Sequence, residues 1–155
     1  MITLQLTTPA HQAALDYTLD DVQMQFTALP SLWFDDDAAM HRRITILYHD
    51  EPAGFFVLDS GIDRADYSDN PNALLLRSMS VAPAHQGKGI ARAALAADVL
   101  LPFARAEFPQ ADEIVLGVHH TNAAAIALYR TCGFADTGKT YMGLRGLQYI
   151  FSRRL

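Results

Sequence analysis

Residues 81–91, VAPAHQGKGIA, decide how this chain folds, because they lead from an apolar strand into a helix through a loop with two glycines. Gly87 and Gly89 have no Cβ atom, so a ligand can come close to their backbone. The first amides of the following helix have no intrahelical partners, and with the positive end of the helix dipole they attract an anion. The stretch therefore predicts a phosphate site between a strand and a helix.

A second stretch shows the same order of strand, loop and helix. Residues 114–118, IVLGV, indicate a buried strand, and residues 122–134 indicate a helix with both ends marked. Asn122 can cap the start of this helix and Gly133 can close its end. Tyr129 follows Asn122 by seven residues, so at 3.6 residues per turn both lie on about the same helix face.

These two segments resemble the hallmark motifs of the GNAT superfamily of N-acetyltransferases. The spacing Gln86-x-x-Gly89-x-Ala91 is similar to the family's diphosphate-binding signature, and Asn122, Tyr129 and the Gly-Phe pair that follows are similar to its second motif. The resemblance implies transfer of an acetyl group from acetyl-coenzyme A to a primary amine, with no metal. It also implies that the cofactor contacts Met79, Ser80, Val81, Gln86, Gly87, Lys88, Gly89, Ile90, Ala91, Asn122 and Tyr129.

Two other glycine-loop patterns fit less well. A Walker loop needs a hydroxyl residue after its lysine, and Gly89 follows Lys88. A dinucleotide-binding loop needs a third small residue where Arg92 stands. Its acidic ribose partner has no clear counterpart, although Asp112 and Glu113 are near the expected position.

Tyr129 is the residue with the clearest catalytic chemistry. A thiolate that leaves a thioester is basic, and a phenol can give it a proton or a hydrogen bond. The alternative is a tyrosine that only fills the core, and Asn122 can be a cap, a cofactor contact or both. Residues 74–80 contain no carboxylate, although many relatives have a glutamate there. The amine must then lose its proton through a water relay, or attack as its small neutral fraction.

A finer resemblance points to the bacterial spermine/spermidine-type acetyltransferases. It is carried by residues 76–81, by Gln23-x-x-Phe26-x-Ala28 and by residues 142–148. It implies a polyamine acceptor that contacts Phe26, Thr27, Tyr141 and Gln148. A protein N-terminus or lysine as acceptor, and a non-catalytic acyl-coenzyme A-binding module, are the alternatives.

Two polar clusters each allow two interpretations. Asp35, Asp36 and Asp37 indicate a solvated helix start, or they help to recruit a polycation. Adjacent residues such as His119 and His120 are expected to point to different sides, which argues against a metal site and for surface histidines or a proton relay.

Composition predicts one domain over residues 1–155, since a chain of this length that is 50% hydrophobic can bury one core. The net charge of −5 argues against nucleic acid and favours a cationic small substrate. The single cysteine, the polar alternation over residues 1–8 and the lack of a long apolar run predict a cytoplasmic protein without a membrane segment. The sequence leaves the oligomeric state open, and a homodimer is one of the alternatives.

The element pattern predicts a mixed α/β sheet with helices on both faces, in the order β-α-α-β-β-β-α-β-α-β-β. Helices are expected over residues 9–25, 32–43, 88–108 and 122–133, with a disturbance at Pro102. Strands are expected over residues 1–8, 44–48, 55–58, 74–81, 113–118, 134–142 and 148–152, with a hairpin turn at 49–54 and a loop over 59–72.

Overall fold

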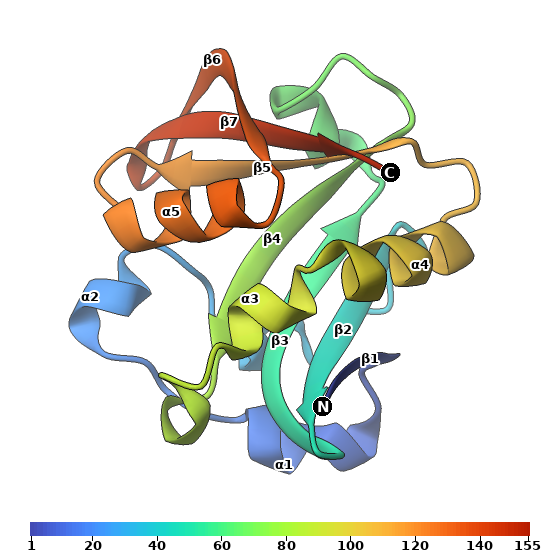
Figure 1. Cartoon of the computed structure of the whole chain (residues 1–155), viewed down its shortest axis with the longest axis vertical. Helices are drawn as coiled ribbons and strands as arrows, with labels where there is room; N and C mark the ends of the chain where they lie inside the picture. Colours follow the sequence, from blue (N-terminus) through green and yellow to red (C-terminus); the bar gives the residue numbers. More distant parts are fainter.

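The computed structural model describes residues 1–155 and arranges them around a seven-stranded sheet of order β1-β2-β3-β4-β5-β7-β6 (Figure 1). All neighbouring strands are antiparallel except β4 and β5, which are parallel. This confirms the predicted mixed sheet. The strands are β1 (Ile2–Leu6), β2 (His41–Tyr48), β3 (Glu51–Asp59), β4 (Ala73–Val81), β5 (Glu113–His119), β6 (Ala135–Gly143) and β7 (Gly146–Arg154).

Short helices and 3₁₀ turns connect these strands. The α-helices are α1 (Gln12–Leu15), α2 (Asp21–Met24), α3 (Ile90–Ala94), α4 (Ala97–Glu107) and α5 (Ala123–Thr131). The 3₁₀ turns are η1 (Pro9–His11), η2 (Pro30–Trp33), η3 (Ile62–Asp66) and η4 (Pro83–His85). No helix has both the length and the apolar character that crossing a membrane requires.

The alternation of side chains along the strands divides the core between the two faces of the sheet. In β3, Phe56 and Leu58 belong to the large core under α3 and α4, and α5 packs on the same core beside β5 and β7 (Figure 1). Phe55 and Val57 point to the opposite face, where they pack with Leu15 of α1. Each such buried side chain contributes ~1.5–3 kcal/mol to folding.

The sheet opens between its two parallel strands. β4 and β5 pair only from Ala73 with Glu113 to Leu75 with Val115, and beyond that point they diverge. A bulge in the β3–β4 ladder accompanies the divergence, and there Ser78 has a φ of +56°. A non-glycine residue in this region costs about 1–3 kcal/mol, so the neighbouring pairing must hold it in place.

The N-terminal helix predicted over residues 9–25 is two helices instead. Asp16 leaves the helical region after α1, and Asp20 starts α2 by accepting a hydrogen bond of 2.8 Å from the backbone amide three residues later. Between them, Tyr17 reaches the sheet, and its hydroxyl lies 2.6 Å from Ser80 Oγ. This long-range contact overrides the local preference for one continuous helix.

The helix predicted over residues 32–43 is wrong. The η2 turn ends at Trp33, and β2 begins at His41, so the last predicted helical residues are a strand. The Arg43 guanidinium donates to two backbone carbonyls at the end of η2, at 3.1 and 2.6 Å. The backbone carbonyl of Arg43 accepts a hydrogen bond from the Thr7 amide at 2.9 Å, and this bond connects the segment to the end of the first strand. Pairing across the sheet decides the conformation here.

The helix predicted over residues 88–108 breaks six residues before the expected place. Leu95 and Ala96 separate α3 from α4, whereas Pro102 lies inside α4 without ending it. Leucine and alanine are good helix formers, so no sequence signal marks this break. Leu95 is fully buried in the main core, and its packing coincides with the change of direction.

The remaining elements follow the prediction with shifted ends. The six predicted strands after β1 all exist, and most are longer than expected. The first hairpin turn is only His49 and Asp50, both with positive φ, as in a two-residue hairpin. The predicted loop over residues 59–72 contains the η3 turn and no strand.

Candidate active site

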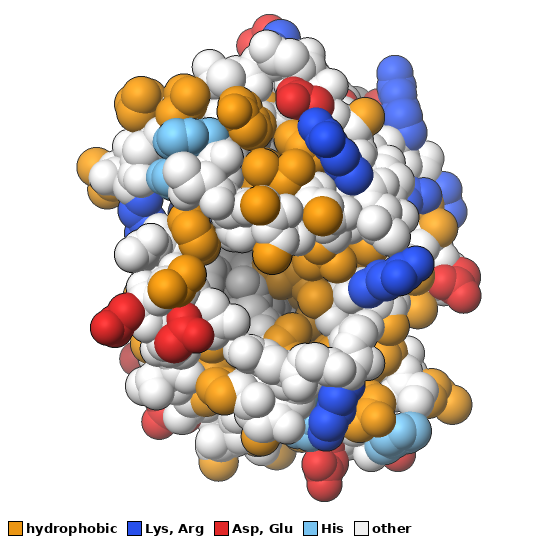
Figure 2. Space-filling view, turned by 60° about the vertical axis from the view of Figure 1, so that its left-hand side comes forward, with side chains coloured by type: hydrophobic (Ala, Val, Ile, Leu, Met, Phe, Trp, Pro, Cys, Tyr) orange, Lys and Arg blue, Asp and Glu red, His pale blue; other side chains and the backbone are white.

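A cavity of about 620 Å³ lies where β4 and β5 diverge. Its walls come from the second half of β4, the loop after it, α3, the end of β5, α5 and the α2 region. Figure 2 looks into a hollow on this side of the molecule, bordered largely by hydrophobic side chains. Strand divergence thus makes room for a ligand without disturbing the core.

The glycine loop borders this cavity with free backbone donors. The amides of residues 87–92 donate no hydrogen bond within the protein. Gly87 and Gly89 have φ values of +81° and +72°, and a Cβ added at either would meet no atom within 4 Å. Since α3 has only five residues, its dipole is weak, and the amides themselves account for the attraction to an anion.

The end of β4 presents backbone at the opening of the sheet. Ser80 and Val81 pair with β3 on one edge, and their other edge faces no strand. Side chains already bind two carbonyls here: Thr27 Oγ1 donates to Met79 O, and Gln86 Nε2 donates to Val81 O, both at 3.0 Å. An added strand-like ligand would share or replace these bonds.

Asn122 and Tyr129 both line the cavity, as their shared helix face predicts. The Asn122 side chain caps α5 by accepting from the Ala125 amide at 3.2 Å. The Tyr129 ring packs edge-on against Phe134, with 5.8 Å between centroids, while its hydroxyl makes no hydrogen bond within the protein. Burial, with a smaller contribution from Cys132, raises the pKa of Tyr129 to about 12.

Among the other predicted loop residues, only Lys88 has no place in the cavity lining. Gln86, Ile90 and Ala91 line the cavity, but the Lys88 ammonium lies 5.3 Å from the centre of the Tyr48 ring and outside the lining. Lys88 can therefore contribute its amide more readily than its charge. His85, which the sequence did not single out, lines the cavity with a buried Nδ1 that has no partner.

A second cavity of about 310 Å³ lies beyond the sheet opening. It shares part of its lining with the first, including Thr27, Ser78 and Gly117, so the two cavities meet. All four predicted acceptor residues line it: Phe26, Thr27, Tyr141 and Gln148. Residues far apart in the sequence thus gather at one place.

Gly117 leaves space for the side chains of Tyr67 and Gln148, which line the second cavity. A Cβ at this position would lie 2.0 Å from Gln148 Oε1 and 2.5 Å from Tyr67 Cε1. The missing side chain lets the Tyr67 hydroxyl donate to Gln148 Oε1 at 3.2 Å. The rings of Tyr67 and Tyr141 are 4.9 Å apart, and burial, followed by Tyr141, raises the pKa of Tyr67.

Charged residues that the sequence reasoning missed also line the second cavity: Asp63, Asp66, Arg77 and Arg145. The two carboxylates come from η3, inside the segment expected to be only a loop. β4 itself contributes no carboxylate, because residues 73–81 contain none. Only the tertiary fold brings η3 beside the acceptor residues, so no local pattern marks it.

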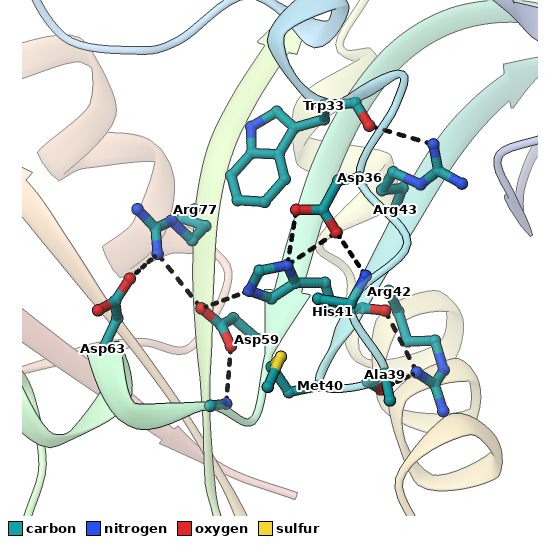
Figure 3. A network of polar contacts seen from close by, with 12 residues as sticks. Trp33, Asp36, Ala39, Met40, His41, Arg42, Arg43, Asp59, Asp63 and Arg77 are labelled. Carbon is teal, nitrogen blue, oxygen red and sulfur yellow. Dashed lines mark hydrogen bonds and ion pairs between the residues drawn. The ribbon is translucent and has the colours of Figure 1, made fainter.

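A polar network holds Arg77, which lines this cavity, in place (Figure 3). Asp59, 1% exposed, accepts from Arg77 at 3.2 Å and from the Gly61 amide at 2.7 Å, and lies 3.3 Å from His41 Nε2. The other His41 ring nitrogen is bonded to Asp36 at 3.0 Å.

The acidic cluster predicted to begin a helix does not do so. Asp35, Asp36 and Asp37 follow η2 in an irregular segment, and none of them lines either cavity. Asp36 is engaged by His41, which fixes it in a structural contact.

The two adjacent histidines do not point to different sides. The rings of His119 and His120 are stacked, with centroids 4.7 Å apart, because β5 ends at His119 and strand alternation no longer applies. His119 Nε2 donates to the Arg145 carbonyl at 2.9 Å, and Nδ1 accepts from the Thr121 hydroxyl at 2.8 Å. Both nitrogens of His119 are therefore occupied by protein groups.

Comparison with known proteins places these features in a family. The model of the acetyltransferase (GNAT) family matches residues 7–134. The uncharacterized N-acetyltransferase YbbJ of Bacillus subtilis is 40% identical over 154 residues, covering 96% of this chain and 94% of that protein.

Solved structures share the fold. The aminoglycoside acetyltransferase AAC(6')-Ib, in complex with paromomycin and acetyl-coenzyme A, superimposes with a TM-score of 0.75 at 19% identity, over 99% of this chain and 93% of the other. The ribosomal-protein-S18-alanine N-acetyltransferase of Escherichia coli gives 0.62 at 20% identity, over 99% and 94%. With its glycine loop, its open β4–β5 pair and these matches, the chain belongs to the GNAT family of acetyltransferases.

Proposed function

We propose that this protein transfers the acetyl group of acetyl-coenzyme A to a primary amine of a small molecule, by direct attack in a ternary complex. The observation that carries the proposal is the run of free amides at residues 87–92, which opens onto a cavity that reaches Tyr129 and meets a second, polar cavity. Structures of AAC(6')-Ib with coenzyme A and an aminoglycoside support this pairing of ligands.

The cofactor would lie along the first cavity. Its diphosphate would bind the free amides of Gly87, Lys88, Gly89, Ile90 and Ala91, where the open space beside both glycines fits a bulky anion. The Gln86 amide donates to Pro83 O at 3.3 Å, so Gln86, which lines the cavity, would contact the cofactor through other atoms. Its pantetheine arm would follow the free edge of Met79, Ser80 and Val81 like an added strand. Asn122 and Tyr129 would then flank the thioester end.

Tyr129 would act on the leaving sulfur. The amine nitrogen attacks the thioester carbon, the C–N bond forms, and the C–S bond breaks with its electron pair on sulfur. The Tyr129 hydroxyl has no other partner and stays protonated at neutral pH, because its pKa is about 12. Since an ordinary thiol has a pKa of about 8.5, a hydrogen bond to the sulfur is favoured over complete proton transfer.

The acceptor would enter through the second cavity, beside Phe26, Thr27, Tyr141 and Gln148. It must lose a proton before or after attack, and water in this polar cavity is the route we propose. A polyamine acceptor remains a prediction, no longer supported by the Asp35 to Asp37 cluster. Cytoplasmic location and a homodimer also remain predictions.

The test measures coenzyme A binding by calorimetry, and thiol release from acetyl-coenzyme A with polyamines, amino acids, aminoglycosides and peptides. Gly89→Ala should weaken coenzyme A binding about tenfold or more, because the methyl group enters the space beside the amides. Gly138→Ala is the matched control, since Gly138 also has positive φ and open space but lies outside both cavities. Both variants should lose similar stability, ~1–2 kcal/mol.

The outcomes separate the candidate functions. Equal coenzyme A affinity in the two glycine variants would contradict the phosphate site. Tight binding with no thiol release for any amine would indicate a binding module, and activity confined to peptides would indicate a protein acetyltransferase.

A further inference from the structure

The second cavity is lined by charged side chains of both signs, and only some of them are paired with one another. This inference rests on the proposed function, because it treats that cavity as the acceptor site. Asp63 and Asp66 line it from η3, Arg77 from β4, and Arg145 from the β6–β7 turn. The formal charges of these four lining residues cancel, so the cavity lining is not the acidic surface that a polycation prefers.

Asp63 and Arg77 satisfy one another. Arg77 lies 2.9 Å from Asp63 and 3.2 Å from the buried Asp59, and its guanidinium lies 5.4 Å from the centre of a Trp33 ring (Figure 3). The Arg77 charge is therefore already balanced by two carboxylates, and a ligand would have to compete with both.

Asp66 and Arg145 are different, because neither has an oppositely charged partner. Asp66 accepts no hydrogen bond and forms no ion pair within the protein. Arg145 donates to the backbone carbonyls of Met24 at 3.3 Å and Thr27 at 2.8 Å, and no carboxylate lies within 4 Å of it. These bonds orient the guanidinium at the cavity and leave its charge available.

We propose that the acceptor is a zwitterionic amine, an amino acid or a similar amino-carboxylate, whose carboxylate binds Arg145 and whose ammonium faces Asp66. Guanidinium and carboxylate form charge-assisted, often bidentate hydrogen bonds. A polyamine would find one unpaired carboxylate and would place its remaining charges near Arg145. At about 310 Å³, the cavity also lies at the lower end of small-molecule sites, ~300–1,000 Å³, which suits one compact molecule.

The experiment compares acceptors that differ only in the carboxylate. Thiol release at saturating acetyl-coenzyme A is measured with ornithine against putrescine, lysine against cadaverine, and ornithine methyl ester as the neutralised form. We expect kcat/KM to be about tenfold or more higher for each amino acid than for its decarboxylated partner, as one charge-assisted contact allows. Added salt should reduce this ratio, because it screens the charges.

Variants assign the ratio to one side chain. Arg145→Met should bring the two members of each pair to within about twofold, whereas Arg145→Lys should retain most of the preference. Arg105→Met is the control, because Arg105 is exposed on α4 and lines neither cavity. Asp66→Asn should raise KM for both members of a pair and leave their ratio unchanged.

The proposal is overturned if putrescine, cadaverine or spermidine is acetylated more efficiently than the amino acids. It is also overturned if Arg145→Met lowers both members of each pair equally, since that indicates a structural role through Thr27. Either result still shows acetyl transfer and leaves the proposed function intact. Absence of both coenzyme A binding and thiol release would instead refute the proposed function itself.

Discussion

At the residue scale, Tyr129 carries the most direct test of chemistry. Tyr129→Phe removes the hydroxyl but keeps the ring that packs on Phe134, so stability and coenzyme A affinity should change little. We expect kcat and kcat/KM to fall together by about 100–1,000-fold, as for loss of one hydrogen-bond donor that acts in the transition state.

The pH profile adds a second readout for Tyr129. Because its pKa is about 12, the parent enzyme should show no loss of kcat from tyrosine ionisation below about pH 11. With an acyl donor whose thiol is more acidic, the steady-state rates of the parent and of Tyr129→Phe should differ by a smaller factor. A Phe variant with the parental rate, when chemistry limits turnover, would make Tyr129 a packing residue.

Tyr17 allows a stability prediction with a defined sign. Burial raises its pKa to about 12, although the hydrogen bond from Ser80 opposes the shift. The folded state then holds the proton more tightly than the unfolded state, so stability is lost as pH rises from about 10 to 12. Tyr17→Phe should be less stable at pH 7 by about 1–3 kcal/mol, because Ser80 loses its partner.

Urea unfolding of parent and Tyr17→Phe at pH 7, 9, 10 and 11 checks this. The gap in unfolding free energy should shrink toward the alkaline end, since the variant lacks the titrating group. Tyr129→Phe serves as a comparison for the gap at pH 7, because the Tyr129 hydroxyl makes no hydrogen bond within the protein and its removal breaks none. A gap that grows with pH would contradict the assigned direction.

At the element scale, strands with strong local signals could be predicted, and elements that depend on distant partners could not. The strand, glycine loop and helix start around Gly89 are encoded within a few residues, as is the cap at Asn122. The helix predicted over residues 32–43 is absent because residues 41–43 pair with β3, and the Arg43 carbonyl accepts from the Thr7 amide just after β1. The η3 carboxylates were missed for the same reason, since only the sheet brings Asp63 and Asp66 beside Gln148.

The bulge at Ser78 is the element that shapes both cavities, and it can be perturbed directly. Ser78→Val places a β-branched side chain at a φ of +56°, where such residues are strongly disfavoured. We expect a loss of ~1–3 kcal/mol in stability and weaker coenzyme A binding. Ser78→Ala should keep most of the affinity, because alanine tolerates this conformation better.

Ser152→Val is the matched control for this change. Ser152 lies in β7, pairs regularly with Val115 and Ala135, and lines neither cavity, so valine should be neutral or stabilising there. Thermal unfolding measures the stability of the three variants, and calorimetry measures their affinity for coenzyme A. If valine changed stability and coenzyme A affinity equally at positions 78 and 152, the bulge would not be what shapes the binding site.

At the scale of the whole molecule, the sheet consists of two halves joined by a short parallel seam. β1 to β4 form one half, and β5 to β7 the other, and the seam ends at Leu75 and Val115. Helices α3 and α5 pack on one continuous core across the seam. A cofactor that binds the glycine loop and also follows β4 toward β5 would therefore bridge the two halves beyond the point where their own hydrogen bonds stop.

This architecture gives a prediction about where a ligand stabilises the protein. Coenzyme A at about 100 times its Kd should add about 2.7 kcal/mol and raise the Tm by roughly 5–10 °C for a domain of this size. In hydrogen–deuterium exchange it should protect residues 86–92 and also the free edges of β4 and β5 near Met79 and Val118. ADP carries the diphosphate but no pantetheine arm, so it should protect the glycine loop and leave those edges unchanged. If ADP protected both edges as strongly as coenzyme A, protection would arise from general tightening of the fold, and the pantetheine arm would not be the bridge between the two halves.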